Sequence, residues 1–165
     1  MLEMALLTIF PGAMAMAGAM DLLTLTIPNR ISLALIIGFF ILAPLAGLGL
    51  TDIASHVACG LATLVVGFLL FARGLIGGGD AKVLAAAGLW IGFEMMLQYT
   101  FLVAIAGGAL ALSLAFYRSM AMPRWALKQD WAVRLHDRNG GIPYGIALAA
   151  GALWIYPSTQ WLTGG

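Results

Sequence analysis

Two aspartates in this chain could together carry out acid–base chemistry. Asp21 follows an apolar N-terminal stretch, and Asp80 ends the run Gly77-Gly78-Gly79-Asp80, after which the sequence is again apolar. Two carboxylates held together in a partly dry site cannot both ionise, so the pair shares a proton and provides an acid beside a base. Such a pair can activate a water to attack a carbonyl group and then protonate the leaving amine. The chemistry that this pairing predicts is hydrolysis of a peptide bond.

The glycines before Asp80 suit a site that another chain must approach closely. Three residues without a Cβ leave the backbone bare and allow a positive φ where one is needed. The alternative is that Gly77–Gly79 form a flexible turn and that Asp80 is the N-cap of the next helix, a position where Asp is favoured. For Asp21 the alternative is an acid that marks the membrane edge. At this level both alternatives stay open.

The composition predicts a membrane protein. Hydrophobic residues make up 62% of the chain and charged residues only 9%, whereas soluble domains contain about 25% charged residues. The length of 165 residues has room for about six spanning helices of roughly 20 residues each, and for no second domain. We therefore expect one all-α integral-membrane domain over residues 1–165. The expected spans are 4–20, 31–50, 57–72, 83–97, 100–117 and 142–162, with a cytoplasmic loop at 118–141.

Six alternating spans place every lysine and arginine on one side of the membrane. These residues are Arg30, Arg73, Lys82, Arg118, Arg124, Lys128, Arg134 and Arg138. The positive-inside rule predicts that this side is the cytoplasm and that both termini lie outside. Asp21 and Asp80 then lie at the same depth, at the cytoplasmic ends of the first and fourth spans, where they can meet. The other acids are expected to be solvated or interfacial charges: Glu3, Asp52, Glu94, Asp130 and Asp137.

Local patterns predict how the spans are connected and packed. A tight turn is expected between residues 94 and 99, and Gly88 and Gly92 form a GxxxG pattern that is expected to pack against another helix such as the first span. The stretch 124–138 spaces apolar residues four apart and predicts a short helix that anchors the loop at the cytoplasmic interface. The first span could alternatively be a signal peptide, but it begins Met-Leu-Glu-Met without a basic n-region.

Other kinds of site find little support in the sequence. His56 and Cys59 are three residues apart on a predicted helix, but both lie at the outer side while His136 is cytoplasmic, so no metal site is expected. The run 74–82 lacks the Gly-Lys-Ser/Thr of a P-loop. No cofactor and no nucleic-acid partner are expected.

The segments around the two aspartates resemble the active-site segments of the prepilin peptidase family. They read MDLLTLTIPNR over residues 20–30 and GLIGGGDAKV over residues 74–83. Members of that family are GxGD intramembrane aspartic proteases with six spans, one catalytic Asp after the first span and the other in the GxGD motif. The resemblance implies that Asp21 and Asp80 are the catalytic pair. It is closest to the short members that serve tight-adherence (Flp) pili.

The resemblance also implies supporting residues near the pair. They are Gly77, Gly79, Pro28, Asn29, Lys82, Pro143, Tyr144 and Gly145. The last three open the final span, where Tyr144 is expected to hydrogen-bond near the acids. Between Asp21 and Ile27 the chain is less basic than expected of close relatives, which would weaken contacts with phospholipid headgroups but leaves both aspartates in place.

The function implied by the resemblance is cleavage of the leader peptide from type IV (Flp-type) prepilin or pseudopilin precursors at the bacterial cytoplasmic (inner) membrane. Membrane lipids and the pilus assembly machinery are the other expected partners, and the apolar helix of the precursor is expected to dock beside spans one and four. Long members also methylate the new N-terminus and carry a large loop with paired cysteines. This chain has only Cys59, so no methylation is expected. The alternatives are a small cation- or proton-coupled transporter and a non-catalytic assembly subunit.

Overall fold

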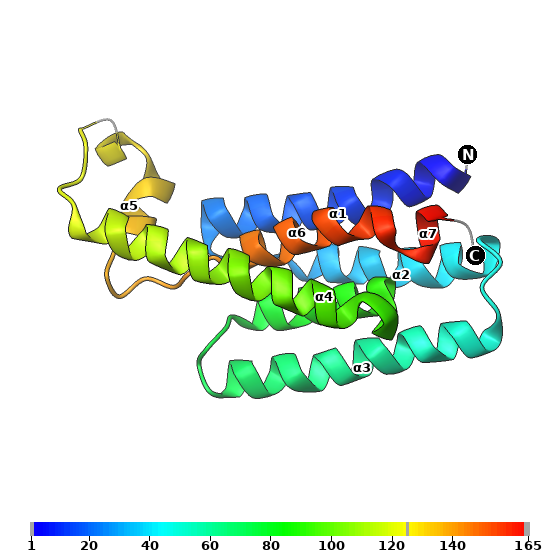
Figure 1. The fold of residues 1–165 in the computed structure, drawn as a ribbon. Helices are drawn as coiled ribbons and strands as arrows, with labels where there is room; N and C mark the ends of the chain where they lie inside the picture. Colours follow the sequence, from blue (N-terminus) through cyan, green and yellow to red (C-terminus); the bar gives the residue numbers. More distant parts are fainter. Residues whose placement is uncertain (1, 125, 164–165) are drawn as a thin grey trace.

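The chain forms a bundle of helices. The computed structural model describes residues 2–124 and 126–163, and within these ranges every regular element is helical. The elements are α1 (Leu2–Thr24), α2 (Asn29–Leu45), α3 (Leu50–Ala72), α4 (Gly78–Ser119), η1 (Ala126–Lys128), α5 (Asp130–His136), α6 (Tyr144–Ile155), η2 (Tyr156–Ser158) and α7 (Gln160–Thr163). Figure 1 shows the long helices running side by side, with α5 at one end and both termini at the other. The all-α fold class is confirmed.

The surface of the bundle is that of a membrane protein. Helices α1, α3 and α4 are each long and apolar enough to cross a membrane. Large apolar side chains are exposed along the helices, among them Phe40, Phe68 and Phe101. A protein in water rarely exposes so much contiguous apolar surface, whereas lipid tails solvate it well. The membrane location that the composition predicted is therefore supported by the packed structure.

Helix α4 is broken at Gly92, where the chain reverses direction (Figure 1). Gly92 has φ 71° and ψ 171°, a conformation that glycine adopts without steric cost. We call residues 78–91 the first limb of α4 and residues 93–119 the second limb. The turn predicted at 94–99 is wrong, because those residues are helical and include no glycine that could take this conformation. The reversal comes earlier, at the glycine.

Gly88 in the first limb and Gly92 at the reversal allow α3 to approach closely. A Cβ added at Gly88 would overlap the Thr63 side chain, and one added at Gly92 would lie 2.8 Å from the His56 ring. Both neighbours belong to α3. The GxxxG pattern therefore packs against α3, and the expectation that it packs against the first span is wrong.

Aromatic residues fill the core at the end where α4 reverses. Trp90 is fully buried, and its indole N–H donates a hydrogen bond to the Leu35 carbonyl oxygen at 2.8 Å. The Trp161 indole N–H donates to the Trp90 carbonyl oxygen at 2.5 Å. Phe10 stacks on Trp90 with ring centroids 5.2 Å apart, and Phe39 meets it edge-on at 6.1 Å. These contacts tie α1, α2, α4 and α7 together at one end of the bundle.

The last apolar segment is interrupted. The sequence predicted one span over 142–162, but α6 ends at Ile155 and is followed by η2 and then by α7. Pro157 lies in η2. Its ring has no N–H to donate and clashes with a continued α-helix, so a break at this position is expected on physical grounds.

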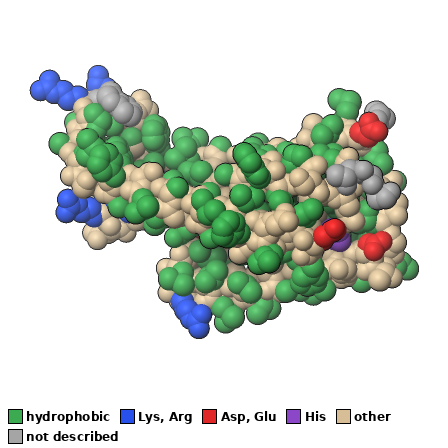
Figure 2. Space-filling model, viewed as in Figure 1, with side chains coloured by type: hydrophobic (Ala, Val, Ile, Leu, Met, Phe, Trp, Pro, Cys, Tyr) green, Lys and Arg blue, Asp and Glu red, His purple; other side chains and the backbone are tan. Residues whose placement is uncertain are grey.

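Charged side chains divide between the two ends of the bundle. On the face shown in Figure 2, Lys and Arg gather at the end that carries α5, whereas Asp and Glu gather at the end that carries the termini. Arg73 follows α3 and Arg118 lies in the last turn of α4, both at the basic end. The gathering of Lys and Arg at one end is the pattern that the positive-inside rule describes.

The reversal at Gly92 gives a direct test of the fold. Gly92→Ala should lower the free energy of unfolding by about 1–3 kcal/mol, since an alanine is strained at positive φ and its Cβ would press on the His56 ring. Thermal unfolding in detergent measures the change. Gly12→Ala is the matched control, because a Cβ there meets nothing within 4 Å. Equal midpoints for Gly92→Ala and the wild type would contradict the reversal.

Candidate active site

Asp21 lies buried near the end of α1. Only 5% of its surface is exposed. Its Oδ2 atom accepts a hydrogen bond of 2.7 Å from the backbone N–H of Gly145, at the start of α6. The acid is therefore held by a residue near the opposite end of the chain, and it is not simply a charge at the membrane edge.

Asp80 lies at the start of α4 and is also buried, with 6% of its surface exposed. Its Oδ2 atom accepts a hydrogen bond of 3.0 Å from the N–H of Gly77. Gly77 is the N-cap of α4, so Asp80 is the third residue of the helix and not the N-cap itself. The alternative that Asp80 is the N-cap residue is therefore wrong, although its side chain binds the N–H of the N-cap residue Gly77. Its Oδ1 atom is buried and has no hydrogen-bond partner among the described residues.

The structure brings the two acids together. Asp21 and Asp80 line one cavity of about 510 Å³ and a second of about 250 Å³. Buried carboxylates that face a shared cavity can hold a proton between them and exchange it with a bound water. The arrangement can therefore supply an acid and a base to the same small volume.

Two glycines make this close meeting of elements sterically possible. A Cβ added at Gly145 would lie 2.8 Å from the Cβ of Asp21 and 2.9 Å from its Oδ2 atom. A Cβ added at Gly79 would lie 3.1 Å from the Cβ of Ile27, and the end of the same Ile27 side chain reaches Gly145. Ile27 therefore wedges between the starts of α4 and α6. The sequence analysis named Gly79 and Gly145 as supporting residues. It did not predict that the Ile27 side chain packs against both of them.

The other predicted supporting residues divide between two places. Asn29 and Lys82 lie together, because the Lys82 ammonium donates a hydrogen bond of 2.9 Å to the Asn29 side-chain oxygen. They join α2 to α4 outside the two acid cavities. Pro28 precedes α2 in an extended conformation, and Pro143 occupies the equivalent position before α6.

Tyr144 lines the larger acid cavity, and its ring packs against Gly107 of the second limb. The hydrogen bond expected from this segment comes from the Gly145 backbone N–H and reaches Asp21. A backbone donor leaves no mark in a sequence, so the residue type could not reveal it. The segment 143–145 lies beside Asp21 as expected, but the donor is the Gly145 backbone N–H and not the Tyr144 hydroxyl.

Arg118 and Leu25 are residues of the cavity that sequence reasoning missed. Arg118 lines it while its guanidinium donates to the carbonyl oxygens of Leu135 at 2.8 Å and Gly141 at 2.9 Å. Leu25 directly follows α1 and has φ 54°, a conformation that is costly for a residue with a side chain. The position of Arg118 at the cytoplasmic end of a predicted span could have indicated that it lies near the acids. No feature of the sequence indicated that Leu25 would line the cavity.

The loop after α4 folds back over this end of the bundle. The predicted helix within 124–138 is realised as η1 and α5. Arg134 of α5 donates a hydrogen bond to the Leu23 carbonyl oxygen of α1, and the Tyr117 hydroxyl donates to the Ala132 carbonyl oxygen at 3.3 Å. These contacts hold the loop against the ends of α1 and α4.

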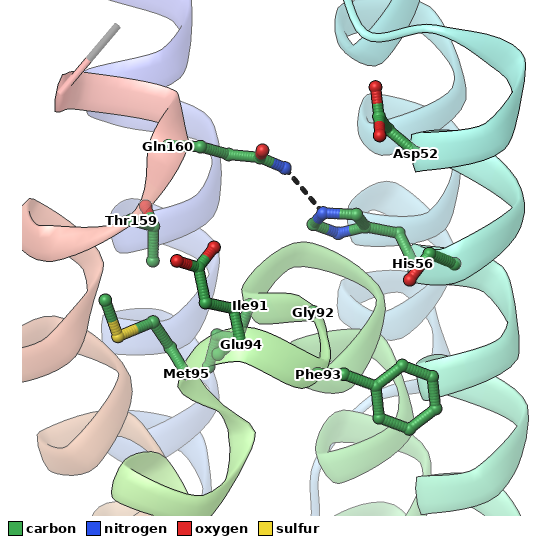
Figure 3. Close-up of a pocket in the computed structure, with 10 residues that line it drawn as sticks. Asp52, His56, Ile91, Gly92, Phe93, Glu94, Met95, Thr159 and Gln160 are labelled. Carbon is green, nitrogen blue, oxygen red and sulfur yellow. Dashed lines mark hydrogen bonds between the residues drawn. The ribbon is translucent and has the colours of Figure 1, made fainter. Parts of the chain in front are cut away.

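A second polar cavity lies at the opposite end of the bundle, near the reversal of α4 (Figure 3). His56 from α3 points toward Gln160 from α7, and their side-chain nitrogens lie 2.6 Å apart. The other ring nitrogen of His56 bonds the Leu89 carbonyl oxygen at 2.8 Å. Both ring nitrogens are thus engaged in joining helices. Among the described residues no three His, Cys, Asp or Glu side chains form a group that could hold a metal ion.

The fold and the site together define a class of protein, namely a helical membrane protein in which two buried acids face one cavity. Comparison with known families matches residues 8–112, well over half of the chain, to the type IV leader peptidase family. The chain belongs to this family and is therefore a peptidase. The match includes both aspartates and ends within the second limb of α4. No curated protein and no solved structure matches the chain.

The contact between Gly145 and Asp21 predicts how the site responds to one added methyl group. Gly145→Ala should lower peptidase activity by about tenfold or more, because its Cβ would displace the Asp21 carboxylate from its position. Cleavage of a leader-bearing precursor in detergent measures the effect. Gly12→Ala, on the open face of α1, should keep wild-type activity. Wild-type activity in Gly145→Ala would show that the position of Asp21 does not matter.

Proposed function

We propose that this protein is an aspartic endopeptidase in which Asp21 and Asp80 form the catalytic pair. The observation that carries the proposal is that these two acids, from α1 and α4, are both buried and line the same cavity. The match to the type IV leader peptidase family supports the same conclusion, since the matched residues contain both acids.

The proposed mechanism needs only the two carboxyl groups and a water. One carboxylate takes a proton from the water as the water oxygen bonds to the peptide carbonyl carbon, and the other, protonated, acid donates a hydrogen bond to the carbonyl oxygen. When the C–N bond breaks, the nitrogen takes a proton from the acid pair and leaves as the amine. The hydrogen bonds from Gly145 and Gly77 each engage an Oδ2 atom. The unpartnered Oδ1 atom of Asp80 is then left for the water or the substrate.

The proposed topology has six spans in a bacterial inner membrane, with residues 1–165 as a single domain. The spans are α1, α2, α3, the two limbs of α4, and α6 continued by η2 and α7. Helices α2 and α6, with 17 and 12 residues, are shorter than the roughly 20 residues of a typical span, so their connecting segments complete the crossing. The division of charge between the ends (Figure 2) supports a cytoplasmic acid site and outer termini.

The proposed substrates are type IV (Flp-type) prepilin-like precursors, cut at the cytoplasmic face to release their leader. Lipids and the pilus assembly machinery are the further partners of this proposal. The acid cavity supports a cut at that face, since it is lined by the loop before α4 and by Gly140 and Gly141 before α6. Among the described residues these segments belong to the basic end of the bundle.

Replacing either acid by its amide separates catalysis from folding. Asp21→Asn and Asp80→Asn should each lower the rate of precursor cleavage by about 100-fold or more, because an amide can neither accept the proton from water nor share one. Asn at position 80 can still accept the Gly77 hydrogen bond, so the start of α4 is kept. The measurement is cleavage of a purified precursor in detergent, with thermal unfolding to show that the variants fold.

Asp52→Asn is the matched control for Asp80→Asn. Asp52 accepts a hydrogen bond from Gly49, three residues before it, at the start of α3, which repeats the capping geometry of Asp80 at the other end of the bundle. This variant should cleave at the wild-type rate, and the wild type should remain active in EDTA. Cleavage at the wild-type rate by either Asp21→Asn or Asp80→Asn would overturn the aspartic mechanism. Loss of activity in EDTA would favour a metal-dependent one.

The proposal also predicts the chemical state of the product. The N-terminus released by cleavage should remain an unmodified amine, even when the methyl donor S-adenosylmethionine is added, since this chain lacks the loop with paired cysteines found in methylating relatives. Mass spectrometry of the cleaved precursor distinguishes the two products. A methylated N-terminus formed by the purified protein would contradict the prediction.

A further inference from the structure

A long apolar groove leads along the bundle to the acid site. It is lined mainly by α3 and the second limb of α4, and has a cavity volume of about 730 Å³. Leu84 of the first limb and Leu148 of α6 contribute to its lining. From the second limb, Phe93 and Met96 line the end near the reversal. The remaining lining residues of this limb are small: Thr100, Val103, Ala104, Gly107, Gly108 and Ala111. Small residues at a helix surface in a membrane allow another helix to approach closely.

One end of the groove reaches Asp80. Asp80, Ile76 and Tyr144 line both the groove and the larger acid cavity. Asp80 is more than nine-tenths buried, and its Oδ1 atom has no partner among the described residues. A buried carboxylate oxygen calls for a hydrogen bond, so the Oδ1 atom offers an acceptor at the end of the apolar groove. Water or a backbone N–H of a bound segment could supply the missing hydrogen bond.

The length of the groove fits a helix and exceeds what a single side chain would need. Its lining runs from Cys59 to Leu70 on α3 and from Phe93 to Ala111 on the second limb. At 1.5 Å per residue these stretches are about 17 and 27 Å long, more than half of the hydrocarbon thickness of roughly 30 Å. Because Ala104 and Gly108 are exposed, the groove is open along its side.

We propose that this groove binds the apolar helix of the precursor and delivers the scissile bond to Asp80. The inference rests on the proposed function and specifies where its substrate lies. It differs from the position expected from the sequence, beside the first and fourth spans, because α1 lies against α6 at Gly18, whereas the open lining comes from α3 and the second limb. The apolar side chains of the precursor helix would contact the apolar lining of the groove. At the end of the groove, the backbone of the precursor would unwind, and its N–H groups could donate hydrogen bonds to Asp80.

Gly108 offers a way to fill the groove without disturbing the fold. A Cβ added at Gly108 meets nothing within 4 Å, and the same is true of Gly12 on α1, outside the groove. Gly108→Leu should lower kcat/KM for a precursor that carries its apolar helix by roughly tenfold, mainly through KM. Gly12→Leu, the matched control, should keep the wild-type value. Thermal unfolding shows whether both variants remain folded.

A second substrate separates docking from chemistry. A short peptide that carries the leader and the scissile bond, without the apolar helix, should show a much smaller loss in Gly108→Leu. Equal losses on the two substrates, or no loss on the full precursor, would overturn the groove assignment while leaving the peptidase function intact. If the wild type cleaves neither substrate, the proposed function itself fails.

Crosslinking identifies the occupant directly. A photoreactive amino acid at position 104, in protein reconstituted with an Asp80→Asn substitution to slow cleavage, should form an adduct with the apolar helix of an added precursor. The same group at position 12 should not. Adducts only with lipid, or only with a second copy of the chain, would assign the groove to those occupants and overturn the proposal.

Discussion

The hydrogen bond from the Gly145 backbone N–H to the Asp21 carboxylate joins residues 124 positions apart. It brings the end of α1 against the start of α6, and it is possible only because Gly145 has no Cβ. Ile27 fills the remaining space and brings in the start of α4 through Gly79. Asp21 and Asp80 belong to different helices. They face one cavity because this junction holds the end of α1 beside the starts of α4 and α6.

The two ends of the bundle have different physical characters. At the end where α4 reverses, stacked aromatic rings and indole hydrogen bonds leave little free space around Trp90. At the other end, short glycine-rich connections surround a cavity lined by acids. A tightly packed end can hold the helices in register while the opposite end admits a substrate. The reversal at Gly92 also sends the second limb back on a separate path from the first, and the apolar groove lies between that limb and α3.

The sequence predicted the helical class and the membrane setting, because composition and the positions of charges can be read directly from the chain. It also predicted that Asp21 and Asp80 would lie close together, and the two acids line one cavity. It predicted less well how helices are joined and paired. The turn was expected at 94–99 but occurs at Gly92, since a positive φ was needed. Gly88 was expected near the first span but packs on Thr63 of α3. The spacing of small residues indicates which face of a helix can pack closely, but it does not indicate which helix packs against that face.

What the sequence determined by itself is the chemistry available: two aspartates beside glycines, in a chain apolar enough for a membrane. The tertiary structure alone decided how that chemistry is placed. The backbone N–H that holds Asp21, the Ile27 wedge and the cation of Arg118 all come from segments distant in the chain. Backbone donors and packing contacts carry no residue-type signature, because any residue has an N–H and many can fill a gap. Only the folded chain shows which of them meet.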